Sequence, residues 1–168
     1  TSPTTFLKTE KKTFQAVALK LQSARDLLAS VSQNVLPSNF HDDLNRAQSA
    51  LNSISELARG TLANFNGILK FLGDDTPHTI LVMLQNASEL RPTGGFIGNL
   101  AFLEFKNGIL TQQEVRDIYH FDHKLTEHLE PPPEIKLINN RWFMRDANSS
   151  LDFPTSARTI ASFLQKEG

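Results

Sequence analysis

The sequence predicts an α+β or α/β fold, in which an N-terminal antiparallel helical hairpin precedes a small, incomplete β-sheet unit with a covering helix. Three observations predict it. Apolar residues recur every three or four positions up to residue 72, the pattern becomes that of extended strands beyond residue 78, and a helical pattern returns near the end. With 168 residues, of which 39% are apolar, the chain can bury a core without disulfides.

The first 73 residues are interpreted as a helical hairpin, because two apolar stripes with a coiled-coil-like 3.5-residue period flank Pro37. The first stripe contains Phe14, Val17, Leu21, Ala24, Leu28, Val31 and Val35. The second contains Leu44, Ala47, Leu51, Ile54, Ala58, Leu62, Phe65, Leu69 and Leu72. We expect two long helices that pack antiparallel through these stripes, with a kink or close approach near Gly60 and Gly67. The hairpin is either a stalk or a docking surface for a partner helix.

A turn-rich segment at 73–77 separates this hairpin from a second domain at 78–168. Residues 79–84 and 96–105 are apolar on both faces and predict two buried strands. Asn107-Gly108 favours a tight hairpin turn into a third strand over 109–121. We expect this sheet to be truncated, with its remaining strands beyond Gly168, so that an open edge or the coiled-coil face could support a homodimer.

A covering helix is predicted to start at Asp152, because Pro154 falls in its first turn and Asp152 can cap it. Its apolar face is expected to contain Phe153, Ala157, Ile160 and Leu164.

Composition excludes several classes of function. The 17 basic and 18 acidic residues leave a net charge of −1, so nucleic-acid binding is not expected. The absence of cysteine excludes disulfides, thiolate zinc sites and cysteine nucleophiles. The longest apolar run, residues 80–84, is far shorter than the ~20 residues of a membrane helix. No hydrolase, phosphate-loop or metalloprotease motif is present, so the sequence assigns no catalytic residue.

Two loops concentrate the candidate site residues. In residues 89–95, Arg91 with Gly94 and Gly95 could bind an anion such as pyrophosphate through the guanidinium and backbone amides; alternatively Arg91 pairs with Glu89 in a tight loop. In residues 141–148, Arg145 is a second candidate for the anion. The alternative there is a structural loop with an Arg145–Asp146 ion pair.

Four carboxylates are candidates for a metal or a structural role. They are Asp117, Asp122, Asp146 and Asp152. Asp117 and Asp122 would point to opposite faces of a regular strand, and a metal pair would need a bulge there. The nearby histidines, His120, His123 and His128, lack a fourth ligand at regular spacing, so no metal is assigned.

Three strings of the sequence resemble the bacterial family known as domain of unknown function 4012. They are ELRPTGGFIG at 89–98, DIY at 117–119, and RDAN at 145–148 followed by DFPTSA at 152–157. The resemblance covers roughly residues 78–165 and implies an extracytoplasmic domain of a membrane-anchored cell-envelope protein. The anchor is expected outside this chain, which we interpret as a piece of a longer protein.

A second similarity, to the LytR-CpsA-Psr transferases, rests on a shared order of strands with Arg91 in a loop and Asp117 at a strand end. It implies binding of a polyprenyl-pyrophosphate-linked glycopolymer, with Arg91 and Arg145 neutralising the pyrophosphate and Asp117, Asp122 or Asp146 holding Mg²⁺. A phosphotransferase of this kind would need the full-length protein, and this chain is expected to be inactive alone. The stretch from Asp117 to Asp122 contains no arginine where those transferases carry an Arg-Asp pair. The alternative is a non-catalytic assembly module of the envelope, whose hairpin contacts other proteins.

Overall fold

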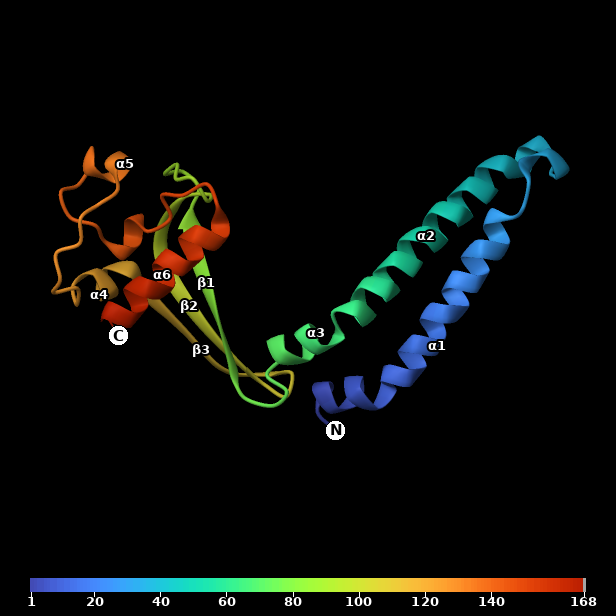
Figure 1. The fold of residues 1–168 in the computed structure, drawn as a ribbon, viewed down its shortest axis with the longest axis horizontal. Coiled ribbons are helices and arrows are strands. Elements are labelled where there is room, and N and C mark those ends of the chain that lie inside the picture. The colour runs from blue at the N-terminus through green and yellow to red at the C-terminus, as the bar shows by residue number, and fades with distance from the viewer. Residues whose placement is uncertain (168) are drawn as a thin grey trace. The chain divides into compact units, whose positions relative to one another are not determined.

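The computed structural model describes residues 1–167, and Gly168 lies outside the described part (Figure 1). The elements, in chain order, are α1 (Pro3–Ala29), η1 (Gln33–Val35), η2 (Ser38–Phe40), α2 (His41–Ala63), α3 (Phe65–Phe71), β1 (His78–Asn86), β2 (Phe96–Lys106), β3 (Ile109–Asp117), α4 (Ile118–Asp122), α5 (Pro133–Lys136), η3 (Met144–Asp146) and α6 (Phe153–Glu167). None of the described helices has the length and apolar character needed to cross a membrane.

The predicted α+β class is confirmed by about 53% helix together with a three-stranded antiparallel sheet in the order β1-β2-β3. The chain forms two compact units. The helical unit contains Thr1–His78 and the β2–β3 turn, Phe105–Ile109; the sheet unit contains Thr79–Glu104 and the chain from Leu110 onward.

The helical unit has the outline of the predicted hairpin. Ser2 caps α1 by accepting a hydrogen bond from the Thr5 amide at 3.2 Å, and Pro3 occupies its first turn. The chain then turns through η1 and η2 into α2. The Gln48 side-chain amide of α2 donates to the Leu28 carbonyl of α1 at 3.1 Å, and the two helices lie side by side (Figure 1).

The seam between α1 and α2 is more open than the stripes predict. Of the residues described in these two helices, only Thr4, Leu44 and Ser55 are buried. Val17 and Ile54, both stripe residues, are 47% and 50% exposed. The reason is that an amphipathic stripe is about 100° wide, whereas each helix of a lone pair covers only a narrow strip of its neighbour.

The predicted second helix is interrupted at Asn64, which separates α2 from α3. The break lies between the two glycines expected to weaken the helix. Asn64 leaves helical geometry at φ −100° and ψ 13°, and its side-chain amide donates to the Gly60 carbonyl at 2.8 Å. An asparagine side chain that bonds to a helix carbonyl competes with the backbone and favours a helix end.

The predicted β2–β3 turn is confirmed, and the end of α3 holds it. Asn107 and Gly108 have φ values of 54° and 81°, the positive pair that a type I′ turn needs. Their amides donate to the carbonyls of Gly73 and Leu72, each at 2.8 Å. Gly73 itself has a φ of 67°, and a Cβ there would lie 2.0 Å from the Phe105 carbonyl oxygen.

The core of the sheet unit lies between the sheet and α4, η3 and α6. Its fully buried members are Ile97, Leu100, Ile118, Phe121, Leu125, Met144, Ala147, Ile160 and Phe163. Leu81 and Met83 of β1 pack against it, whereas Leu84, on the opposite face, is 43% exposed. The expectation that the first two strands are buried on both faces therefore holds for one face of β1, whereas in β2 the adjacent residues Leu100 and Ala101 are both buried.

The third strand is shorter than predicted, because α4 begins directly after Asp117. The Asp117 carboxylate accepts a hydrogen bond from the Tyr119 amide at 2.8 Å and so caps α4. Ile118 and Phe121, three residues apart, then both enter the core, which the alternating pattern of a strand would not allow.

The covering helix α6 begins as predicted. The Asp152 carboxylate accepts from the Thr155 amide at 2.9 Å and caps it. Of its predicted apolar face, Ile160 is buried and Leu164 packs against the core, whereas Phe153 is 57% exposed. Ser156 and Phe163, which were not predicted, are also buried.

We predict that Gly73→Ala lowers the free energy of unfolding by about 2–3 kcal/mol, because alanine is strained at positive φ and its Cβ would collide with backbone. Gly60→Ala is the matched control: nothing lies within 4 Å of a Cβ there, and helix propensity should raise stability by about 0.5–1 kcal/mol. Urea unfolding followed by far-UV circular dichroism measures both. Equal effects of the two substitutions would contradict the structural role of Gly73.

Candidate functional site

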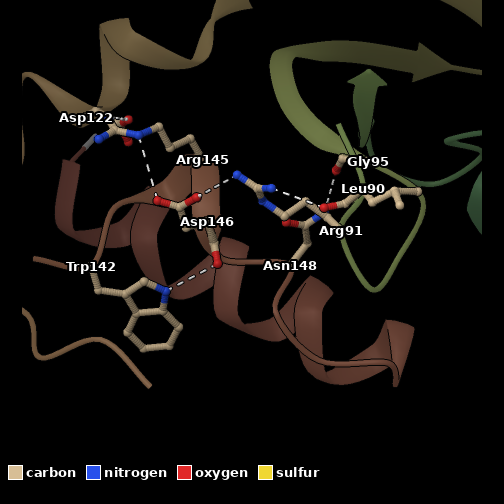
Figure 2. Close-up of polar contacts among 8 residues, drawn as sticks. All are labelled: Leu90, Arg91, Gly95, Asp122, Trp142, Arg145, Asp146 and Asn148. Carbon is tan, nitrogen blue, oxygen red and sulfur yellow. Dashed lines mark hydrogen bonds and ion pairs between the residues drawn. The ribbon is translucent and has the colours of Figure 1, made fainter. Parts of the chain in front are cut away.

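Four of the predicted site residues come together in the sheet unit, where Figure 2 shows two arginines and two aspartates in a row. We call Arg91, Asp122, Arg145 and Asp146 the arginine–aspartate cluster. Arg91 comes from the loop between β1 and β2, Asp122 from the end of α4, and the other two from η3. The cluster therefore joins three segments that are distant in the sequence.

Asp122 is the buried centre of this cluster. Its side chain is 2% exposed, and one oxygen accepts from an Arg145 Nη1 at 2.8 Å while the other accepts from the Met144 amide at 3.0 Å. Burial nevertheless raises the pKa of Asp122, because desolvation of the carboxylate outweighs the attraction of the Arg145 guanidinium and these hydrogen bonds.

Arg145 is held on several sides. Besides Asp122, its Nε lies 3.8 Å from a carboxylate oxygen of Asp146. Its guanidinium also lies over the rings of Phe143, at 4.2 Å, and Tyr119, at 5.4 Å. The predicted Arg145–Asp146 pair exists, but the shorter contact is with Asp122. An arginine this fully engaged has little freedom to meet a ligand.

Arg91 is held more loosely. Its Nη2 lies 3.6 Å from an Asp146 carboxylate oxygen, and its Nη1 donates to the Leu90 carbonyl at 3.1 Å. Its Nε is buried and has no hydrogen-bond partner among the described residues. The alternative partner expected from the sequence, Glu89, instead accepts from the side chain of Asn86 at 3.3 Å.

The two glycines of the loop shape it and connect it to η3. Gly94 has a φ of 125°, and its amide donates to the Arg91 carbonyl at 3.1 Å, so this amide is already used within the loop. Gly95 has a φ of 156°, and a Cβ there would lie 2.2 Å from the Asn86 carbonyl oxygen. Its own carbonyl accepts from the fully buried Asn148 side chain at 2.8 Å (Figure 2).

Asp117 and Asp152 lie outside the arginine–aspartate cluster and act as helix caps. Hydrogen bonds from the Thr155 hydroxyl and amide lower the pKa of Asp152, since they favour its charged form. The histidines near Asp122 form ring contacts: His120 with Phe121, and His123 with Tyr119. Within residues 1–167, no group of three or more histidine, aspartate or glutamate side chains is placed to hold a metal ion.

Three further residues support the site and were not among the sequence candidates. Asn148 connects the loop to η3 as described, and the Trp142 indole donates to the Asp146 carbonyl at 3.3 Å. Arg141 donates to the carbonyls of Leu125 and Glu127. Of these three, Asn148 had a signal in the sequence. It is the amide of the RDAN string and follows an Arg-Asp pair in a polar loop, where a side-chain amide is a candidate for a hydrogen bond to the backbone.

We predict that Arg145→Met destabilises the sheet unit by about 3–5 kcal/mol at neutral pH, because it leaves the Asp122 carboxylate buried without its cation. The pKa of Asp122 is higher in the folded state than in the unfolded state. The charged carboxylate therefore lowers the stability when the pH is above the folded-state pKa, and this cost disappears when the pH is below the unfolded-state pKa. The loss should therefore shrink as the pH falls toward about 4. Fluorescence of Trp142, the one tryptophan of the chain, reports unfolding of this unit.

The matched control is Arg158→Met, since the Arg158 side chain is 74% exposed and lies 3.9 Å from Asp152. It should change stability by less than about 0.5 kcal/mol. A pH-independent loss for Arg145→Met would show that lost packing on Phe143, rather than an unpaired Asp122, dominates.

Comparison with known proteins identifies the region that contains this site. The family model described as "Protein of unknown function (DUF4012)" matches residues 75–168, which include the sheet and the arginine–aspartate cluster. No curated protein and no solved structure matches the chain. The similarity to LytR-CpsA-Psr transferases stays a prediction. Because the family match covers more than half of the sequence, the chain belongs to the DUF4012 family.

Proposed function

We propose that this protein is a non-catalytic assembly module of the bacterial cell envelope, in which the arginine–aspartate cluster stabilises the fold and the helical unit contacts other proteins. One observation carries the proposal: both candidate arginines already lie against aspartates. Its envelope location is supported by the resemblance to the family's typical members.

A pyrophosphate site needs positive charge that the protein has not already neutralised. In the cluster, the charges of Arg91 and Arg145 are balanced by those of Asp122 and Asp146. The 2% exposure of Asp122 also leaves little access for a hydrated Mg²⁺ ion, which usually keeps several of its waters. These features favour a structural role for the cluster over phosphoryl transfer.

The helical unit supports the assembly role. Large apolar side chains of both helices remain exposed around one shared groove, including Val17 at 47%, Ile54 at 50% and Leu57 at 72%. Exposed apolar residues on two adjacent helices are typical of a surface that packs against another helix.

A second candidate function is binding of a lipid-linked pyrophosphate at Arg91, as the similarity to LytR-CpsA-Psr transferases implies. The observation that favours it is the buried Arg91 Nε, which lacks a partner among the described residues, together with the loose 3.6 Å contact to Asp146. A phosphate oxygen would have to replace Asp146 beside this guanidinium.

We predict that Mg²⁺ with a prenyl pyrophosphate leaves the thermal unfolding midpoint unchanged. A ligand that binds only the folded state raises this midpoint, by several degrees when its concentration is about 100 times the Kd. A rise that Arg91→Ala abolishes and Arg158→Ala preserves would establish the second candidate instead. Arg91→Ala alone should cost about 1–2 kcal/mol, since Asp146 keeps its contact with Arg145.

A further inference from the structure

The helical unit contains an apolar groove at the end near the N-terminus. The groove has a volume of about 280 Å³ and lies between α1 on one side and α2 and α3 on the other; its walls include Leu7, Phe14, Val17, Ile54, Leu57 and Phe65. A groove between two helices accepts the side chains of a third helix or turn, as in knobs-into-holes packing. Its apolar walls point to an apolar occupant.

The opposite end of the same unit presents an apolar surface of its own. Where α1 connects to α2, Val35 is 75% exposed and Phe40 is 50% exposed. Asp42 and Asp43 follow directly, in the first turn of α2. We call this end, residues 31–43, the hairpin tip.

The charges of the two ends are complementary. The hairpin tip contains two aspartates, Asp42 and Asp43, and neither lysine nor arginine, whereas residues 1–12 contain three lysines and one acidic residue, Glu10. One of these lysines, Lys8, is paired with Asp74 at 2.8 Å. Lys11 is positioned beside the groove, with its Nζ 4.7 Å from the ring centre of Phe65. Lys11 beside the groove and the adjacent Lys12 are therefore opposite in charge to Asp42 and Asp43 of the hairpin tip.

We propose that a second copy of this chain binds antiparallel along the helical unit, so that the hairpin tip of each copy enters the groove of the other. Asp42 and Asp43 of one copy then face Lys11 and Lys12 of its partner, and a twofold axis repeats the contact. The inference rests on the assembly role proposed above and identifies the protein that the helical unit contacts as a second copy of the same chain.

The size of the helical face fits such a dimer. A helix of 27 residues is about 40 Å long, and two such helices about 10 Å apart present a face of roughly 800 Å². This is about the area that each partner buries in a stable interface of standard size. The 3.5-residue period of the exposed stripes also matches that of a second identical helix pair.

Charge-reversal variants of the whole chain test this arrangement by sedimentation velocity. The wild type is expected to be a dimer at tens of micromolar. Asp42→Lys/Asp43→Lys and Lys11→Glu/Lys12→Glu should each weaken dimerisation at least about tenfold, because like charges then meet at both contacts. An equimolar mixture of the two variants should dimerise like the wild type, since each tip again faces an opposite charge. Circular dichroism confirms that all variants keep their helices.

The control is Glu130→Lys/Glu134→Lys, which makes the same change of net charge as Asp42→Lys/Asp43→Lys, but in the sheet unit, and should leave the dimer intact. Cross-linking gives a second measurement, because the chain has no cysteine of its own. Thr9→Cys/Asn39→Cys should form a disulfide-linked dimer, while each single substitution should not.

A wild type that stays monomeric to about 100 μM overturns the proposed second copy. A dimer that resists both reversals, or a mixture that fails to recover, overturns the antiparallel arrangement. The assembly role itself is tested separately by the pyrophosphate titration. A monomer with no ligand response rejects only this inference, whereas a response lost in Arg91→Ala rejects the proposed function.

Discussion

The packing of the sheet unit depends on the hydrogen bonds and the ion pair of one buried carboxylate, that of Asp122. The Asp122 side chain is 2% exposed, and a buried charge of this kind is costly unless it is paired and hydrogen-bonded. Both partners, Met144 and Arg145, lie more than 20 residues further along the chain. Satisfying this carboxylate therefore brings η3 against α4, which places the fully buried Met144 side chain in the core.

From Asp122 the polar contacts extend outward and become looser. Asp146 lies between Arg145 and Arg91, at 3.8 Å and 3.6 Å, and Asn148 joins η3 to the loop at Gly95. Loss of Arg145 would leave Asp122 buried without a cation. Loss of Arg91 would still leave Asp146 paired with Arg145. Any ligand would therefore act at the Arg91 end, because that end can exchange partners without disrupting the centre.

Local patterns predicted much of this fold, whereas its long-range pairings were beyond them. The Asn107-Gly108 turn and the Asp152 cap follow from residue types at adjacent positions, and the structure confirms them. The Asp122–Arg145 pair joins residues 23 apart through mostly irregular chain, where no periodicity reports proximity. The sequence alternation around Tyr119 also fitted a strand. Whether Ile118 and Phe121 lie on one face, as in a helix, depends on the core that they contact, which the local pattern does not report.

The open seam of the helical unit has a different cause. Residues of both apolar stripes, such as Val17 and Ile54, stay about half exposed although α1 and α2 are neighbours. Full burial of an aliphatic side chain returns about 1.5–3 kcal/mol, and a half-exposed stripe residue such as Ile54 recovers only part of it. Summed over both stripes, this unrecovered free energy favours association with further helices. In the dimer that we propose, the opposite charges of Lys11 and Lys12 and of Asp42 and Asp43 set the antiparallel orientation of the two copies.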